Sequence, residues 1–452
     1  MAGIQNASLR HAAYYVQLLY QHNQGYLRGG EEQASALRQF EIELPNLRAV
    51  QERLPGLLDP LGKKHELSPI DLAFLEVSNI IPDAGAYLIN VKLSALERIK
   101  WLEDALRASQ RLQNDVTTQA HMGNLGLAHY ELGELPQAIE YFQQALQVAE
   151  RIGDQYHQGA WLGNLGNTYS LLGEHEKAME YHERHLELVQ ENKDKRGEGH
   201  ALANLGVSYA YLGQLPQAIE NYEKHLDLAR QQGDQYEEAR ALMNLGFAQY
   251  DAGNFDASSD YLNSAKRIAT ELGDMGTWSL VIGGLADIAI ERNEYAAAIQ
   301  LLQDALKVLR DIRGIEAELR LLQSLGNAYS ASDDLENAMQ TYSQLYDLAR
   351  SVGAKAAMCS ALANQTSLYR HMGDYPNAIK TGEQALSLAK QIQSQSDEAF
   401  VRWQFALIDE ANGMFEKAKQ EMEIVIETEE QFGSLDLERH REHLILLIRQ
   451  ML

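Results

Sequence analysis

The sequence predicts an all-α protein in which antiparallel helix pairs stack into a solenoid. The first observation is a triplet, Asn-Leu-Gly, that recurs every 40 residues. The same phase continues less regularly, and the triplets of the eight units begin at Asn124, Asn164, Asn204, Asn244, Gly284, Ser324, Asn364 and Gln404. The second observation is a position thirteen residues after the Leu, which is alanine in seven of the eight units. A fixed period of roughly 20–50 residues is the signature of a repeat architecture.

A turn between these two phases divides each unit into two helices, A and B. The turn carries Gly133 in the first unit and glycine in five others, with Asn293 and Asp333 in the remaining two. These residue types tolerate the left-handed backbone that closes a helix. In the first unit the pattern predicts helix A over 117–132 and helix B over 135–152. A Gly-Asp pair such as Gly153-Asp154 then ends helix B, and its aspartate is expected to cap the next helix.

Small residues are expected where the two helices of a unit cross. Gly126 and Ala138 supply them in the first unit, and their equivalents recur along the chain. A glycine inside a helix costs about 1 kcal/mol relative to alanine, so close approach of the helices is the reason to expect it there.

The complete pattern resembles a tetratricopeptide (TPR) repeat. The pattern consists of Leu-Gly with an aromatic residue three positions after the Gly, followed by the spacing of Ala138, Phe142 and Ala145; the aromatic residues are Tyr169, Tyr209, Tyr329 and Tyr369. The 40-residue unit is similar to the longer variety in kinesin light chain and related adaptors. The resemblance covers 117–432 and implies a right-handed TPR superhelical solenoid of eight units.

The regions that flank the repeats are also predicted to be helical. Residues 433–452 form an amphipathic capping helix, with Leu444, Leu447, Ile448 and Leu452 on one face. Residues 55–116 form a degenerate helical repeat, in which 101–108 have the helix-B pattern and the partner lies around 69–83. Residues 1–54 form two or three helices of a different character.

The first 54 residues contain two short segments, His11-Ala-Ala-Tyr-Tyr15 and Glu43-Leu-Pro-Asn-Leu-Arg-Ala49. They resemble the linker that follows the nucleotide-binding module of bacterial STAND (NB-ARC-like) ATPases. This resemblance implies that the chain is the C-terminal ligand-sensing part of such a signalling protein, with a nucleotide-binding module upstream. The string Gly56–Lys64 does not match a phosphate-binding loop, because its spacing is one residue too long and a lysine replaces the hydroxyl residue.

Composition excludes several classes of function. The net charge is −25, so the chain is expected to bind neither nucleic acid nor an anionic membrane surface. No apolar run approaches the roughly 18 residues of a membrane span, and no secretory signal begins the chain. Cys359 is the single cysteine, which excludes a disulfide framework and fits a cytoplasmic location.

No residues are arranged as a recognisable catalytic, cofactor or metal site, so an enzyme is not predicted. His182 and His185 lie three apart on a helix, as do His440 and His443, and His225 repeats the phase of His185. We interpret them as partly buried histidines that bond to neighbouring side chains rather than as metal ligands. Cys359 is interpreted as a small core residue.

The remaining candidate for function is the concave wall lined by the A helices. Each triplet asparagine is expected to face it, and a side-chain amide suits both the N–H and the C=O of an extended peptide. This ladder consists of Asn124, Asn164, Asn204, Asn244 and Asn364. In TPR families of this type the matching asparagine contacts ligand backbone. Alternatively, the amides bond to neighbouring helices and only brace the superhelix.

Other wall positions extend the candidate site. Small residues one position before the triplet, such as Gly123 and Gly163, are expected to leave room for a guest. Basic residues suited to carboxylates are His200, Arg240, Arg320 and Arg370, unless they pair with Glu237 or Glu316. Aromatic residues suited to guest side chains are Tyr130, Phe247 and Tyr250. The ladder is interrupted at Gly284 and Ser324, which predicts two sub-sites.

Three functions remain open. The leading hypothesis is a module whose wall captures a protein or peptide segment, as the sensor of a STAND-type ATPase. A free-standing adaptor or scaffold that bridges proteins is the second, and a structural, self-associating solenoid is the third.

Overall fold

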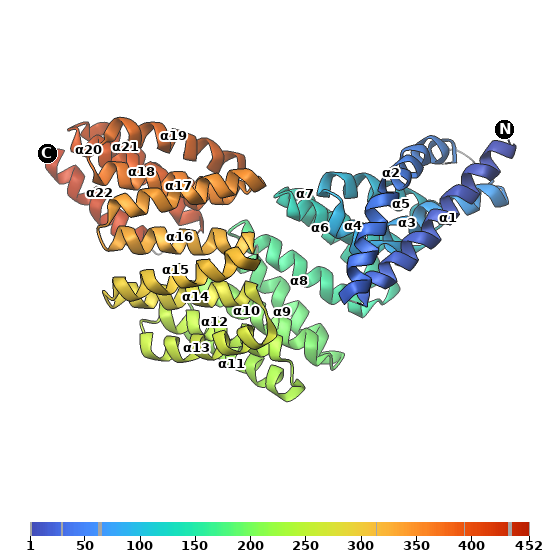
Figure 1. The fold of residues 1–452 in the computed structure, drawn as a ribbon, viewed down its shortest axis with the longest axis horizontal. Coiled ribbons are helices and arrows are strands. Elements are labelled where there is room, and N and C mark those ends of the chain that lie inside the picture. The colour runs from blue at the N-terminus through green and yellow to red at the C-terminus, as the bar shows by residue number, and fades with distance from the viewer. Residues whose placement is uncertain are drawn as a thin grey trace. The chain divides into compact units, whose positions relative to one another are not determined.

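The computed structural model describes residues 2–28, 30–61, 66–312, 314–392, 394–432 and 436–451. Within these ranges the chain forms 22 helices and no strand (Figure 1). The predicted all-α solenoid is therefore confirmed. The chain divides into two compact units, Met1–Leu172 with Glu180–Lys193, and Gly173–Met179 with Asp194–Leu452.

The first unit begins with helices that precede the regular repeats. Its helices are α1 (Ala2–Leu27), α2 (Gly30–Leu61), α3 (Pro69–Ala84), α4 (Ala86–Lys92), α5 (Ala95–Arg111), α6 (Asp115–Glu131), α7 (Leu135–Ile152) and α8 (Gln155–Leu171), and α9 (His175–Glu191) is shared by both units. One hydrophobic core joins α1, α2, α3 and α5 through Leu19, Phe40, Leu75 and Trp101. The segments 1–54 and 55–116 therefore share a core, and α2 continues past residue 54.

The second unit follows the 40-residue period. Its helices are α10 (Lys195–Tyr211), α11 (Leu215–Gln232), α12 (Gln235–Asp251), α13 (Phe255–Leu272), α14 (Met275–Glu291), α15 (Tyr295–Ile312), α16 (Ile315–Ala331), α17 (Leu335–Val352), α18 (Lys355–His371), α19 (Tyr375–Ile392), α20 (Gln395–Ala411), α21 (Phe415–Phe432) and α22 (Leu437–Met451). The even-numbered helices from α6 to α20 are the A helices of the repeats, and the odd-numbered ones from α7 to α21 are the B helices.

The helix ends follow from the turn residues. Gly153 ends α7 with a φ of 72°, and the Asp154 carboxylate accepts a hydrogen bond from the backbone N–H of His157 in α8. Asp234 and Asp274 cap α12 and α14 in the same way. The predicted left-handed turns between A and B helices are confirmed as well, including the non-glycine residues Asn293 and Asp333 at φ of 59° and 60°.

These turns give a first prediction. Gly253 has a φ of 76° and open space where a Cβ would lie, so replacing it with alanine strains the backbone without a steric clash. We expect Gly253→Ala to lower the free energy of unfolding by about 1–2 kcal/mol in chemical denaturation. Asp333→Gly, at the same repeat position, is the control and should not destabilise the protein. Equal stability of Gly253→Ala and the wild type would contradict the expectation.

The helix crossings are close because glycine lies at them. A Cβ at Gly206 of α10 would overlap the ring of Tyr222 in α11, and the same relation joins Gly326 to Tyr342. Tyr222 is 4% exposed and Tyr342 is 2% exposed. Gly206 and Gly326 therefore admit an aromatic ring from the B helix, and Gly246 admits the side chain of Leu262, which confirms the expected close approach.

The A helices form the inner layer of the second unit. Successive A helices contact one another from α10 to α20, and each B helix from α11 to α19 contacts the A helix before it and the one after it. In the described residues, no contact of comparable extent joins two successive B helices. Because the inner layer of a curved stack is the more closely spaced, the A helices line the concave side.

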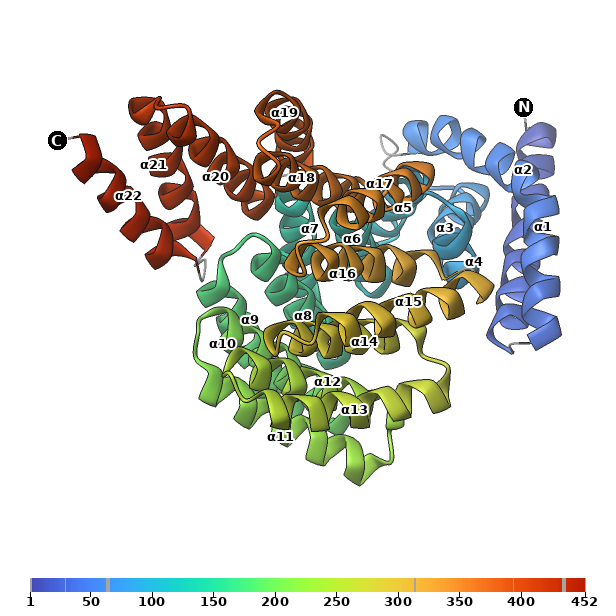
Figure 2. The same ribbon diagram turned by 60° about the vertical axis from the view of Figure 1, so that its left-hand side comes forward.

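The last helix, α22, covers the end of the second unit, where Figure 2 shows it as the outermost helix. Leu447 is buried against the core of α20 and α21, and Leu444 packs beside it. Ile448 is half-buried, and Leu452 lies outside the described residues. Trp403 of α20 stacks on the imidazole of His440, with ring centroids 3.8 Å apart.

Candidate functional site

Each A helix leaves one face uncovered. In α10 this face carries His200, Asn204, Val207 and Tyr211, which are half-buried or exposed, whereas Leu202, Leu205 and Gly206 are buried. Spacings of four, three and four residues place side chains on one side of a helix. We call these positions, and their equivalents in the other A helices, the open face. The triplet asparagine lies in its centre.

The five ladder asparagines are all half-buried on this face. Asn364 donates a hydrogen bond to the backbone oxygen of Ser360 in its own helix, at 2.9 Å. Among the described residues the side-chain amides of the other four have no hydrogen-bond partner; these are Asn124 and Asn164 in the first unit and Asn204 and Asn244 in the second. None of the five therefore braces a neighbouring helix through its amide.

The expectation that the small residues before the triplet leave room for a guest is wrong for Gly123. A Cβ at this position would overlap the indole ring of Trp161, which comes from α8 and is only 5% exposed. The indole N–H donates to Oε1 of Gln119 at 2.7 Å, so the ring is held in place. Ala203 and Ala363 are buried too. These small residues accommodate neighbouring side chains of the protein itself.

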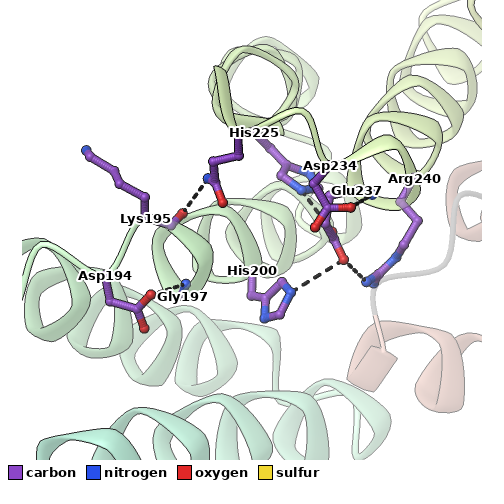
Figure 3. A network of polar contacts seen from close by, with 9 residues as sticks. Asp194, Lys195, Gly197, His200, His225, Asp234, Glu237 and Arg240 are labelled. Atoms are coloured by element: carbon purple, nitrogen blue, oxygen red, sulfur yellow. Dashed lines mark hydrogen bonds and ion pairs between the residues drawn. The ribbon is translucent and has the colours of Figure 1, made fainter. Parts of the chain in front are cut away.

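Two of the predicted basic residues meet at one carboxylate in the second unit (Figure 3). Glu237 of α12 lies 3.0 Å from Nη1 of Arg240 and 3.4 Å from Nε2 of His200 in α10. Nε2 of His225, from α11, approaches its second oxygen at 3.1 Å. The side chain of Glu237 is 14% exposed and that of His225 is 1% exposed. The network ties three successive helices together.

The contacts explain the electrostatics of this network. Hydrogen bonds from His200 and His225 are the main reason that the pKa of Glu237 falls far below its ordinary value, and the charge of Arg240 adds to the effect. Glu237 therefore remains a carboxylate at neutral pH, and it neutralises Arg240. The alternative expected from the sequence, pairing of a wall arginine with Glu237, is confirmed for Arg240.

The other two arginines have neutral partners. Nε and Nη2 of Arg320 in α16 donate to Oγ of Ser279 in α14, at 3.4 and 3.0 Å, and the expected pairing with Glu316 is not found in the described structure. Nε of Arg370 in α18 donates to Oε1 of Gln404 in α20 at 2.8 Å. Arg240, Arg320 and Arg370 therefore do not converge on one site.

The aromatic candidates lie on α6 and α12. Phe247 leans onto α14, where a Cβ at Gly284 would lie 2.6 Å from its ring. This contact explains why the ladder is interrupted at residue 284. The Tyr250 hydroxyl donates to Glu291 at 3.4 Å, and burial and the nearby carboxylates raise its pKa to about 12. Tyr130 is half-buried in the first unit, and burial raises its pKa.

Sequence reasoning missed two acidic residues on the open face of α14. Asp287 lies where α10 has Val207, and Glu291 lies where α10 has Tyr211. Burial, together with the charge of Glu291, raises the pKa of Asp287 to about 6. Extending the ladder position by three and seven residues along helix A would have found both.

Cys359 is a buried core residue, and the expected bonds to neighbouring side chains are found for His440 and His443, whereas the buried Nδ1 of His182 has no hydrogen-bond partner among the described residues. His182 is 1% exposed and fills the space above Gly166, while His440 and His443 bond to Glu429 and Glu410 at 2.9 and 2.8 Å. No group of three or more potential metal ligands is found among the described residues. Cys359 is fully buried, and burial raises its thiol pKa to about 12. The string Gly56–Lys64 lies partly outside the described residues.

No single helix in the described ranges combines the length and the apolar character needed to cross a membrane. The bent pair α3–α4 reaches both only when its two helices are taken together.

Comparison with protein families agrees with this geometry. Residues 117–191, 198–271, 319–351 and 361–396 match models described as tetratricopeptide repeat. These segments are tetratricopeptide repeats, so the resemblance to tetratricopeptide repeats is confirmed for them. No curated protein matches the chain significantly.

Solved structures with a similar fold include a Rap protein and a quorum sensor. A Rap protein complexed with Competence and Sporulation Factor has 14% identity and a TM-score of 0.51, over 87% of this chain and 99% of its own. The apo form of the quorum sensor NprR from B. thuringiensis has 16% identity and a TM-score of 0.51, over 79% and 97%. A STAND protein with a tetratricopeptide repeat sensor from Pyrococcus horikoshii has 17% identity and a TM-score of 0.47, over 78% and 54%. At these identities the likeness concerns the fold.

Proposed function

We propose that this chain is a binding module without catalytic activity, whose open face captures an extended segment of a peptide or protein. The proposal rests on the burial and the missing hydrogen bonds of four side-chain amides, those of Asn124, Asn164, Asn204 and Asn244. Each amide is half-buried on the open face of its own A helix, and none has a hydrogen-bond partner among the described residues. A polar group that is partly removed from water without a partner favours a ligand that supplies one. An extended backbone offers both a donor and an acceptor to each amide.

The fold of the similar structures supports the same function. The Rap protein was solved with a factor bound, and NprR is described as a quorum sensor. By analogy, the segment captured here is a peptide or a protein tail. Since both comparisons fall below 25% identity, the proposal depends on the asparagines themselves.

The test is a triple substitution, Asn164→Ala with Asn204→Ala and Asn244→Ala. Linear random heptapeptides displayed on phage are selected on the wild type, and the dissociation constants of the enriched peptides are then measured by calorimetry. We expect the triple variant to bind them at least roughly tenfold more weakly, because each lost hydrogen bond contributes about 0.5–1.5 kcal/mol. Its melting temperature should be unchanged or higher, since alanine is the better helix former.

Two outcomes would contradict the proposal. Unchanged affinity in a folded variant would mean that the asparagines do not contact the ligand. Loss of the helical circular dichroism signal would mean that they hold the superhelix. Asn364→Ala is a matched control, because that amide already bonds within its own helix.

We further propose that the module is the sensor of a STAND-type ATPase, with a nucleotide-binding module upstream. The resemblance of His11–Tyr15 and Glu43–Ala49 to the STAND linker supports this setting. Capture of the ligand would then shift the ATPase toward its active state only by the difference in affinity between the two states. A phosphate-binding loop encoded in frame upstream of Met1 supports this setting, and a start codon there supports a free-standing adaptor instead.

A self-associating scaffold is the third candidate. It predicts a mass in light scattering that rises with protein concentration, and no enrichment of peptides by the open face. A monomer that enriches peptides would exclude it.

A further inference from the structure

The open face of α14 carries opposite charges at its two ends, and each lacks an ionic partner. Arg320, which belongs to α16, lies at the N-terminal end of this face and donates a hydrogen bond to Ser279 of α14. Asp287 and Glu291 lie at its other end. All of these residues belong to the second compact unit.

The cationic end is supplied by Arg320, one of the described arginines that do not lie against a carboxylate. The chain's 39 basic residues are outnumbered by 64 acidic ones, and most described arginines lie against a carboxylate. Arg320 is half-buried, and the hydroxyl of Ser279 is the hydrogen-bond acceptor of its guanidinium among the described residues. The planar guanidinium has five N–H donors and matches a carboxylate in a bidentate geometry. Ser279 accepts hydrogen bonds from two of the guanidinium nitrogens, but its neutral hydroxyl does not neutralise the positive charge.

The anionic end, in turn, lacks a cationic partner. In the described structure no cationic side chain lies within ion-pair distance of Asp287 or Glu291, and Arg292 pairs with Asp256 instead. Tyr250 donates a hydrogen bond to Glu291, which orients that carboxylate without neutralising it. The raised pKa of Asp287, caused by burial and by Glu291, agrees with the lack of a cation.

Between the two ends the face is apolar. Leu280 is 39% exposed, and the half-buried ring of Phe247 covers Gly284. From Ser279 to Asp287 is eight helical positions, or about 12 Å, and to Glu291 it is about 18 Å at 1.5 Å per residue. An extended chain covers these distances in about four or five residues at 3.3 Å each.

From this arrangement we infer that the second unit selects an extended peptide segment with a carboxylate at one end and a Lys or Arg four or five residues away, separated by apolar residues. The carboxylate binds Arg320, the cation binds Asp287 and Glu291, and the apolar residues lie over Leu280 and Phe247. The inference rests on the proposed function and specifies its ligand. Opposite charge at both ends also fixes the direction in which the segment lies, because reversal would place like charges together.

The heptapeptide selection tests this charge pattern. On the wild type, we expect enriched peptides to share an acidic and a basic residue at that separation with apolar residues between them. A synthetic peptide of this consensus should bind Arg320→Glu roughly tenfold more weakly, because attraction becomes repulsion. Exchanging the acidic residue of the peptide for lysine should restore its affinity for Arg320→Glu. Asp287→Asn with Glu291→Gln should remove the preference for the basic residue only.

The controls separate this inference from the proposed function. Arg267→Glu makes the same charge change on the exposed surface of α13 and should leave binding unchanged. Arg320→Gln removes the charge without adding a negative one beside Glu316, in case Arg320→Glu folds poorly. Enriched peptides without the charge pair, or equal binding to Arg320→Glu and the wild type, would overturn the inference while sensitivity to the asparagine triple variant still supports peptide capture. No enrichment on the wild type would overturn both.

Discussion

Replacing Gly123 with alanine should destabilise the protein by about 1–3 kcal/mol, although alanine is the better helix former. The added methyl group would overlap the indole ring of Trp161. That ring cannot move aside easily, because it is buried, donates a hydrogen bond to Gln119, and stacks on Phe142 at 6.1 Å between centroids. Overpacking of a filled core costs about 1–3 kcal/mol. Chemical denaturation followed by circular dichroism measures the change.

Gly163→Ala is the matched control for this effect. Gly163 has the same position in the next repeat, but a Cβ there would lie 3.5 Å from His185, which is ordinary van der Waals contact. We expect this variant to be as stable as the wild type or more stable, by up to about 1 kcal/mol from helix propensity. Changes of the same sign in the two variants would show that Trp161 does not determine the cost at Gly123.

Glu237→Gln should destabilise the second unit by roughly 1–3 kcal/mol at neutral pH, because a charged acceptor is lost beside three donors. The effect should depend on pH. The pKa of Glu237 is lowered in the folded protein, mainly by His200 and His225, so its carboxylate stabilises the fold above the ordinary value of 4.5. This contribution is lost as the pH falls below 4.5 toward the folded-state pKa. The stability difference between wild type and Glu237→Gln should therefore shrink from pH 5 downward.

Glu238→Gln is the control for this prediction. Glu238 is the next residue, and it pairs with the exposed Arg230 at 2.9 Å. Exposed ion pairs contribute about 0–1 kcal/mol, so this variant should differ little from the wild type at any pH. If the stability difference between the wild type and Glu237→Gln stayed constant between pH 7 and 4, the charge of Glu237 would not be what stabilises the network.

The sequence alone predicts most of the fold, because the signals are local and repeated. Helix B of the first unit was expected over 135–152 and is Leu135–Ile152, and the left-handed turns lie at the predicted residues. The flanking regions lack a repeat against which to align them. The shared core of α1, α2, α3 and α5, and the extension of α2 past residue 54, depend on contacts distant in sequence.

The candidate site is harder to predict from the sequence than the fold. The repeat position of a residue indicates on which face of its helix it lies, but not which side chain it contacts. The stripe containing the asparagines follows from helical spacing. Trp161 reaches Gly123 from the next A helix, and Phe247 reaches Gly284, so a small residue does not by itself indicate free space. Similarly, Arg240 and Arg320 share a repeat position, yet one meets Glu237 and the other Ser279.

The environment of Cys359 makes the protein convenient for site-specific labelling. Its thiol is fully buried, and burial raises its pKa to about 12, so the reactive thiolate is scarce at pH 7. A cysteine introduced at an exposed position would therefore react with maleimide dyes selectively, without prior removal of the native one. Two such positions within the second unit would let energy transfer between fluorophores report whether that unit changes when a ligand is added.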